Sequence, residues 1–599
     1  MEIGPGQILS DQGRCCVTTM PTALHRSGPV ASLLLTLCVL GTLSCAREQL
    51  TATGAERLFG KNKVSDTSYR WKEIQGNQFR IIYPEELRQR AFHIARIYDA
   101  NLERISHDLG VRLDRTIPVF IYPSQEEYET THITTGLVEG TGGFTEFFKE
   151  RVVFPVHSSN RHLDHLALHE MTHAVQLKYL LQGPYRSLQL LLTGVLSPLW
   201  FLEGLAEYES GAWDSIAAMH VRDAVMDHKL IPLNQLRGFS HLATPQIHLA
   251  YHQSDLFIQF LVETYGPQCI ARVLRLTKNR LNLHSALEKV TGLKPLSLEW
   301  KWQEYADGRL RVGGSGWQDP PGQARLLTDN RGWNLFPSYS PGGSRIAFLS
   351  DWENEGFYFS LYILERATGR LRKIKERGLE HSPLGWSHDG KRLVLVSDDD
   401  NRSDLYLYDL EQNKLERIEQ RFRDSRQPSF LPGDEEVGFV ATVNGIADVY
   451  KIRLADGRIT PLTQTPSDES HPRWSPDGRF LIFSREYLEQ DDLVLKDLGS
   501  GEETRLTHTP YHELSPVFIP GGRALIYVSD QGGIFNLHWL DLESGMSWPL
   551  SRVIGGVFTP QVSQDGQRVL FSYFRHGQYR IFESPMLKKT SGAGDAQGS

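Results

Sequence analysis

Two histidines and a glutamate stand close together in LALHEMTHAV, residues 166–175. His169 and His173 are four residues apart, and Glu170 directly follows the first. On a helix, side chains at this spacing share a face with Cβ atoms about 5 to 6 Å apart, close enough for two imidazoles to bind one zinc ion. An ordinary helix face is the alternative, because 22 histidines produce this pattern by composition in roughly one such chain in twenty.

The neighbouring residues of this helix bear on the choice. We expect Glu170 to lean towards an apolar stripe, where burying a carboxylate is costly unless it has a task. His162 and His165 share the histidine face and could be ligands instead; we interpret them as solvated residues or as residues that support the ligands. The apolar stripe consists of Leu163, Ala167, Ala174 and Leu177.

A second segment, SPLWFLEGLAEYES at residues 197–210, carries two glutamates at helical spacing. Ser197 and Pro198 are typical of an N-cap and a first helical residue. Glu203 and Glu207 then fall on one face, one turn apart. A solvated acidic face is the alternative, but the flanking Trp200, Phe201, Leu202 and Leu205 argue against full exposure. Gly204 would let another helix approach closely.

Together, HEMTH and WFLEGLAEYES resemble the gluzincin metallopeptidases, in which a second helix supplies a glutamate as third zinc ligand. The resemblance spans roughly residues 79–308 and implies one Zn²⁺ per chain. It implies that His169, His173 and Glu203 are the ligands. By the same resemblance, Glu170 would be the general base of peptide hydrolysis, and Glu207 would orient a ligand histidine.

Two departures from the family bear on the activity. The spacer between His173 and Glu203 is 29 residues long and contains the apolar run LQLLLTGVLSPLW, residues 188–200, which would cover the cleft or touch a membrane. The aminopeptidase motif Gly-x-Met-Glu-Asn is absent, and GGFTE at residues 142–146 does not match it. An endopeptidase acting on proteins or peptides is therefore favoured.

A tetrahedral oxyanion needs a hydrogen-bond donor besides the metal. Tyr251, in LAYHQS, is the candidate, with His248 and His252 as alternatives. A buried structural role for Tyr251 is equally open. We also expect the strand RVVFPV, residues 151–156, to pair with an extended substrate as a sheet edge.

The elements that must position these residues are predicted to form an α+β zincin-like domain over residues 68–313. Apolar, β-branched runs predict strands at 79–84, 116–123 and 151–156, with a helical stretch between the first two. Only helices are expected from there to residue 310, one of them ending at Gly266 and Pro267. The Gly- and Pro-rich residues 314–323 read as a linker.

The remainder, residues 324–587, is an internal repeat. Turns such as SPGG, SHDG and SPDG begin at residues 340, 387, 431, 475, 519 and 563, with spacings of 47, 44, 44, 44 and 44. Short strands at such a period predict an all-β six-bladed propeller. ARLLTD, residues 324–329, should join the last blade and close the ring. PRWSPDG at residues 472–478 resembles the TolB-like propellers, a likeness specific for the fold that implies docking or gating.

The N-terminus, residues 1–45, reads as an export signal, with Met1 or Met20 as the start. The apolar run at 30–43 is about 14 residues, short of the roughly 20 that a bilayer span needs. TLSC resembles the lipobox of bacterial lipoproteins, which implies acylation at Cys45; plain secretion is the alternative. Residues 46–67 would be a linker and residues 588–599 a disordered tail.

Ala46 after the cysteine implies, by the same resemblance, an outer-membrane lipoprotein facing the periplasm or the cell surface. The net charge of −8, without a basic stripe, argues against nucleic acid as a partner. The favoured function is an exported zinc endopeptidase in the cell envelope, whose propeller gates or docks substrates. The alternative is a lipid-anchored binding protein whose propeller docks an envelope partner.

Overall fold

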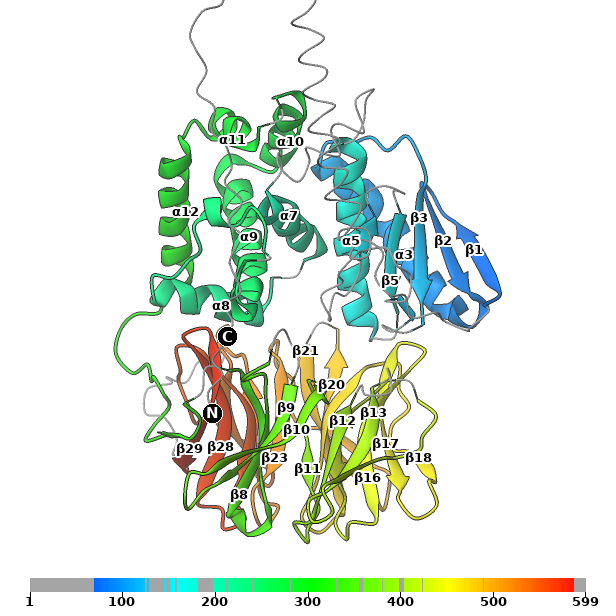
Figure 1. Ribbon diagram of the computed structural model, residues 1–599, viewed down its shortest axis with the longest axis vertical. Helices are drawn as coiled ribbons and strands as arrows, with labels where there is room; N and C mark the ends of the chain where they lie inside the picture. The colour runs from blue at the N-terminus through cyan, green and yellow to red at the C-terminus, as the bar shows by residue number, and fades with distance from the viewer. Residues whose placement is uncertain are drawn as a thin grey trace, which may run out of the picture. The chain divides into compact units, whose positions relative to one another are not determined.

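The computed structural model has an α+β domain followed by a six-bladed propeller (Figure 1). It describes residues 69–123, 127–128, 144–146, 151–156, 159–180, 198–211, 213–239, 241–280, 282–329, 332–354, 359–379, 381–397, 403–422, 424–488 and 490–586. None of the helices in these ranges is both long enough and apolar enough to cross a membrane.

The first domain contains a five-stranded sheet in the order β1-β2-β3-β5-β4. Its strands are β1 (Trp71–Gln75), β2 (Phe79–Pro84), β3 (Ile117–Tyr122), β4 (Phe144–Glu146) and β5 (Arg151–Pro155). The short 3-10 helix η2 (Glu85–Leu87) leads from β2 into α3 (Arg88–Asp108). The three strands predicted from sequence are present, and β1 and β4 are additional. β1 lacked an apolar signal because four of its five residues are exposed.

The expectation that residues 151–156 form a sheet edge was wrong. β5 is parallel to β3 on one side and antiparallel to β4 on the other. β5 reads as apolar because it is interior, with four of its five residues buried. The edge next to it is β4, which lies within the GGFTE segment.

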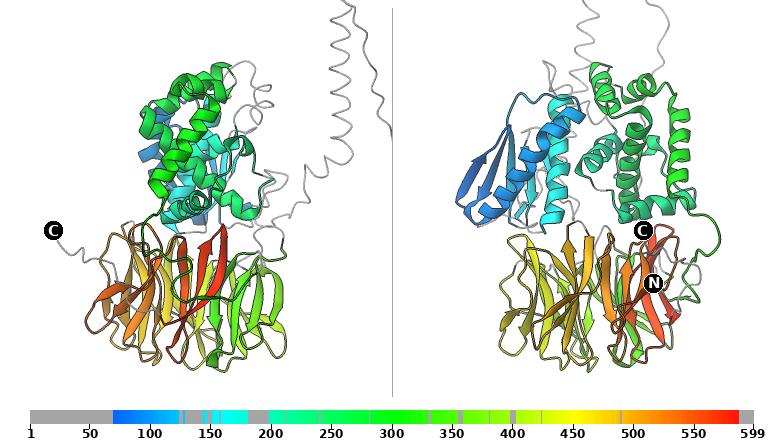
Figure 2. Two further views of the ribbon diagram at one scale, coloured as in Figure 1. Left: turned by 90° about the vertical axis from the view of Figure 1, so that its left-hand side faces the viewer. Right: turned by 180° about the vertical axis from the view of Figure 1, so that it is seen from behind.

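Helices complete this domain (Figure 2). They are α5 (Asn160–Leu180), α7 (Leu199–Ser210), α8 (Ser215–Met226), α9 (Thr244–Tyr265), α10 (Cys269–Arg280), α11 (Leu283–Thr291) and α12 (Pro295–Leu310), with the 3-10 turn η3 (Leu233–Gln235). α9 ends at Gly266, as predicted. α7 begins one residue later than expected, with Pro198 as its N-cap; the predicted cap Ser197 lies outside the described residues.

The propeller has six blades. Its strands are β7 (Asn334–Tyr339), β8 (Arg345–Ser350), β9 (Phe359–Glu365) and β10 (Leu371–Leu379); β11 (Gly385–Trp386), β12 (Arg392–Ser397), β13 (Asp404–Asp409) and β14 (Lys414–Arg417); β15 (Ser425–Phe430), β16 (Glu436–Val443), β17 (Ile446–Arg453) and β18 (Ile459–Pro461); β19 (Glu469–Trp474), β20 (Phe480–Tyr487), β21 (Gln490–Asp497) and β22 (Glu503–Arg505); β23 (Glu513–Phe518), β24 (Ala524–Ser529), β25 (Asn536–Asp541) and β26 (Ser547–Pro549); and β27 (Gly556–Val562), β28 (Arg568–Arg575), β29 (Gln578–Pro585) and β6 (Arg325–Leu326). The short turn η4 (Pro341–Gly343) lies between β7 and β8.

The ring closes as the sequence predicted. β6, from the start of the repeat region, pairs antiparallel with β29 of the last blade, Leu326 opposite Phe582. The first two blades are additionally joined by one residue pair, Leu379 with Ser397. Joining the first and last strands of a propeller in one blade removes the free ends that a linear array of sheets would have.

The repeated turn owes its residues to a local hydrogen-bond pattern. In SPDG at residues 475–478, the hydroxyl of Ser475 donates to Asp477 Oδ1 at 2.5 Å, and the amide of Phe480 donates to Ser475 Oγ at 2.8 Å. Gly478 has φ of 73°, a conformation that glycine adopts without strain. This turn closes the hairpin between β19 and β20.

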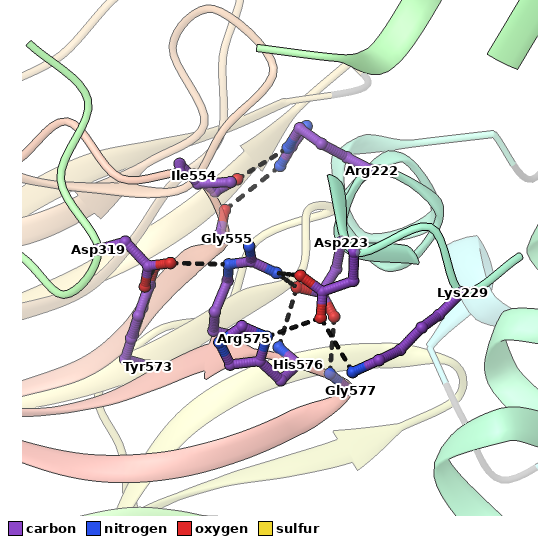
Figure 3. A network of polar contacts seen from close by, with 11 residues as sticks. Arg222, Asp223, Lys229, Asp319, Ile554, Gly555, Tyr573, Arg575, His576 and Gly577 are labelled. Carbon is purple, nitrogen blue, oxygen red and sulfur yellow. Dashed lines mark hydrogen bonds and ion pairs between the residues drawn. The ribbon is translucent and has the colours of Figure 1, made fainter. Parts of the chain in front are cut away.

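Polar contacts from α8 reach the last two propeller blades, and Figure 3 shows those with the last blade. Asp223 accepts hydrogen bonds from Arg575 Nη1 at 2.6 Å and from the backbone amides of His576 and Gly577 at 2.9 and 2.6 Å. Arg222 donates to the carbonyl oxygens of Ile554, Gly533 and Gly555. Both side chains are almost fully buried, so these bonds form away from bulk water.

Candidate metal centre

Three side chains from two helices converge on one point. The Nε2 atoms of His169 and His173, both on α5, are 3.1 Å apart. Glu203 Oε2, on α7, lies 3.3 Å from the Nε2 atom of His169 and 3.2 Å from that of His173. These residues form one of the two groups of potential metal ligands among the described residues.

The separations of these three atoms fit a zinc ion. Zinc binds histidine nitrogen and carboxylate oxygen at about 2.0–2.1 Å with tetrahedral angles, which places its donor atoms roughly 3.3 Å from one another. The observed 3.1 to 3.3 Å matches this triangle. The separations of the three predicted ligands are therefore compatible with one shared ion.

Close packing of the helices produces this convergence. The predicted stripe of α5, including Leu163 and Ala167, is buried in the domain core, and so are Trp200 and Phe201 of α7. Gly204 lets α7 approach α9, because a Cβ atom there would lie 2.5 Å from the backbone oxygen of Ser254. The glutamates of α7 are thereby turned towards the histidines of α5.

Glu207 lies behind the first histidine. Its Oε1 is 3.1 Å from His169 Nδ1, the ring nitrogen that does not face Glu203. His165 Nε2 is 3.6 Å from the other carboxylate oxygen. His165, His169 and Glu207 form the second group of potential metal ligands. The sequence placed Glu207 as an orienting carboxylate and His165 in a supporting position, and both are adjacent to His169.

Gln176 was missed by the sequence reasoning. Its side-chain oxygen lies 3.2 Å from His173 Nδ1, and its amide nitrogen donates to the carbonyl of Leu202 at 3.0 Å. The available signal was its position three residues after His173, which places both on one helix face. From the sequence alone, a glutamine that supports a ligand cannot be told from one that only packs in the core of a helix.

Charge compensation dominates the cluster. Burial alone would lower the pKa of His169, but hydrogen bonds to Glu203 and Glu207 raise it well above its usual value. The pKa of His173 is likewise lowered by burial but raised overall, chiefly by Glu203. Burial would raise the pKa of Glu203, yet His173 and His169 hold it at about 2. The carboxylates thus favour positive charge between them, whether protons or a cation.

The proposed general base and oxyanion donor lie near the same cluster. Glu170 is 5% exposed and acts electrostatically on His173. Tyr251, on α9, packs against Phe239 with ring centroids 5.2 Å apart. Burial first, and then Glu203, Glu207 and Glu170, raise the pKa of Tyr251 well above its usual value.

The two alternative oxyanion donors pack with a third imidazole, His220. His248 stacks on Trp333 of the propeller with ring centroids 5.3 Å apart. His220, on α8, has its ring centroid 5.3 Å from that of His252 and 5.7 Å from that of His248. Burial, followed by His252, lowers the pKa of His248 to about 4. Cys45, most of the apolar run 188–200 and the first two residues of GGFTE lie outside the described residues.

Comparisons with known proteins agree with this division of the chain. Residues 98–308 match the family described as the Peptidase MA superfamily, and residues 319–487 and 457–592 match the TolB beta propeller domain. A search of curated proteins found no match.

The solved structures that match parts of this chain include TolB from Acinetobacter baumannii, with 20% identity over 43% of this chain and 65% of that chain at a TM-score of 0.32. A putative TolB from Agrobacterium tumefaciens has 16% identity over 44% of this chain and 93% of that chain, at a TM-score of 0.34. A puromycin-hydrolyzing peptidase from Mycobacterium tuberculosis has 12% identity over 40% of this chain and 42% of that chain, at a TM-score of 0.31. The family matches and the fold together show that the chain carries a Peptidase MA superfamily domain followed by a TolB-like six-bladed β-propeller.

Proposed function

We propose that this protein is a zinc-dependent endopeptidase. The observation that carries the proposal is the triangle of His169 Nε2, His173 Nε2 and Glu203 Oε2, with sides of 3.1 to 3.3 Å. Three protein ligands leave the fourth tetrahedral position open, which is typical of catalytic rather than structural zinc. The match of the surrounding domain to the Peptidase MA superfamily supports the same reading.

The proposal assigns roles to two further residues near the triangle. When bound, zinc would polarise the scissile carbonyl and make water a stronger acid. Glu170, the buried carboxylate beside His173, would accept the proton of the attacking water and pass it to the leaving amine. Tyr251 would donate its hydroxyl proton in a hydrogen bond to the developing oxyanion.

An extended peptide could reach this centre along the sheet. Among the described strands, β4 is the edge on the side of β5, and its own partner is β5 alone. An edge strand offers backbone groups that recognise a peptide without strict demands on its side chains. This mode of binding suits an endopeptidase, because it needs neither end of the substrate chain.

The test is proteolysis by the purified protein with Glu170→Gln as the key variant. We expect cleavage of an unfolded protein substrate to require zinc, to stop with a chelator and to return when zinc is added. Glu170→Gln should keep one zinc per chain but lose about 10²- to 10⁴-fold in kcat, the usual size of a general-base contribution.

Metal content separates this proposal from the rival function of a binding protein. Glu170 is not one of the three converging ligands, so the zinc content of Glu170→Gln should equal that of the wild type. His173→Ala provides the opposite control, because it should lose both metal and cleavage. If the wild type binds zinc but cleaves nothing, or if Glu170→Gln cleaves normally, the domain is not this kind of peptidase.

We further propose that the protein is attached to a membrane through an acylated Cys45, as the TLSC motif implies. The finding that none of the described helices can span a bilayer is compatible with a lipid anchor. Cys45→Ser should be exported and appear in the soluble fraction, whereas the wild type should sediment with membranes. A Cys45→Ser protein that stays membrane-bound would point to the apolar run at 188–200 or to a protein partner on the propeller.

A further inference from the structure

We infer that Gln176 is a positioning residue of the metal centre: its side-chain amide holds the His173 ring in the zinc-binding tautomer and ties it to helix α7. This inference rests on the proposed function in taking the ion to be bound at His173. It goes further by assigning a task to a buried residue outside the HExxH motif.

A histidine binds zinc through one nitrogen only if that nitrogen is free of its proton. Nε2 of His173 faces His169 and Glu203, so the proton must reside on Nδ1. Gln176 Oε1 lies 3.2 Å from Nδ1 and can accept that hydrogen bond. Fixing the proton there leaves the lone pair of Nε2 directed into the ligand triangle.

The orientation of the glutamine amide is itself determined. Its NH₂ group donates to the Leu202 carbonyl at 3.0 Å, a bond buried within the domain. A flipped amide would turn oxygen towards the Leu202 carbonyl and NH₂ towards the N–H of His173, so that both hydrogen bonds would be lost. The acceptor is therefore held in place on the side of His173.

Leu202 directly precedes the third ligand, Glu203. Gln176 consequently connects a ligand histidine of α5 with the turn of α7 that carries the ligand glutamate. The centre is then arranged before an ion enters, because the same amide that orients His173 also docks α7 beside it. Such supporting hydrogen bonds typically contribute 10- to 100-fold to metal affinity.

The two histidines of the site have partners of different charge. Nδ1 of His169 faces the carboxylate of Glu207 at 3.1 Å, whereas Nδ1 of His173 faces a neutral amide. Glu170, Glu203 and Glu207 already place three carboxylates around the ligand nitrogens. A neutral acceptor orients the second histidine without a fourth negative charge in a buried space.

The experiment measures zinc affinity by competition with a chromophoric chelator in the full-length protein. Gln176→Met preserves the volume and removes both hydrogen bonds, whereas Gln176→Glu keeps the acceptor for the N–H of His173 and loses only the donor to the Leu202 carbonyl. We expect the dissociation constant for zinc to rise 10- to 100-fold in Gln176→Met and to recover in part in Gln176→Glu. If Gln176 only filled space, Gln176→Met would bind zinc more tightly than Gln176→Glu, because a core tolerates methionine better than a buried carboxylate.

Gln259→Met is the matched control. Gln259 is also a buried glutamine on a helix, but its amide donates to Asp255 Oδ1 within α9. This variant should bind zinc as tightly as the wild type, and the melting temperatures of the metal-free proteins show whether either change disturbs folding.

Each outcome has a separate meaning. A wild-type dissociation constant in Gln176→Met, an equal loss in Gln259→Met, or Gln176→Glu binding more weakly than Gln176→Met overturns the inference. A wild type that binds no zinc overturns the proposed function itself.

Discussion

The hydroxyl of Tyr251 keeps its proton at neutral pH. Burial, and then the carboxylates of Glu203, Glu207 and Glu170, raise its pKa well above 10. A protonated phenol is a hydrogen-bond donor, as an oxyanion requires, whereas a phenolate would repel it. Tyr251 can therefore donate the hydrogen bond that the sequence analysis assigned to it.

Removing this hydroxyl should slow the reaction without releasing the metal. For Tyr251→Phe we expect about a 10²- to 10³-fold fall in kcat, with unchanged zinc content, because one oxyanion donor is lost. Tyr265→Phe is the control: Tyr265 lies on the same helix, and its buried hydroxyl has no hydrogen-bond partner among the residues that the structure describes. Equal activity of Tyr251→Phe and Tyr265→Phe would assign Tyr251 a structural role only.

At the scale of elements, the position of α7 decides whether Glu203 reaches the histidines. α7 lies between α5, which it faces with its glutamates, and α9, which it approaches at Gly204. A Cβ atom at residue 204 would lie 2.5 to 2.8 Å from three atoms of Ser254, two of them backbone atoms that cannot rotate away. The convergence of Glu203 with His169 and His173 thus depends on a glycine, which has no side chain that could bind an ion.

Gly204→Ala should force α7 and α9 apart. We expect it to lower the free energy of unfolding by about 1–3 kcal/mol, the usual cost of overpacking, and to weaken zinc binding because Glu203 moves with its helix. Gly308→Ala, in α12, is the comparison, since a Cβ atom there would meet no described atom within 4 Å. Chemical denaturation and zinc titration of both variants test this; identical values for the two would exclude a steric role for Gly204.

At the scale of the whole molecule, α8 connects the domain of the candidate metal centre to the propeller. It follows α7 directly in the chain, and its Asp223 is held by Arg575 and two backbone amides of the last blade. Arg575 also binds Asp227 at 2.8 Å and Asp319 at 3.0 Å. The helix that follows Glu203 and Glu207 is therefore held by residues more than 300 positions later in the chain.

Arg575→Leu should uncouple the two domains. Leaving Asp223 buried without its cation costs about 3–5 kcal/mol, so calorimetry should show the two domains unfolding at more widely separated temperatures. Arg580→Leu is the control, because Arg580 hydrogen-bonds to Gln578 within the same strand. Superimposable thermograms for the two variants would mean that other contacts hold the domains together.

The sequence by itself determined the repeat and the ligand motifs. Periodic turns and strands predicted six blades and the joining of residues 324–329 to the last one, and helical spacing paired His169 with His173 and Glu203 with Glu207. These features are local, because a turn needs its own Asp and Gly and a helix face needs only the 3.6-residue period.

Only the tertiary structure decided which strand is the sheet edge, how α7 meets α5, and which residue supports His173. β5 was mistaken for an edge because an apolar strand has the same composition whether or not a short neighbour such as β4 covers it. Gln176 was overlooked because its second partner, Leu202, lies 26 residues away. Contacts between distant segments depend on packing, which single-sequence periodicity does not encode.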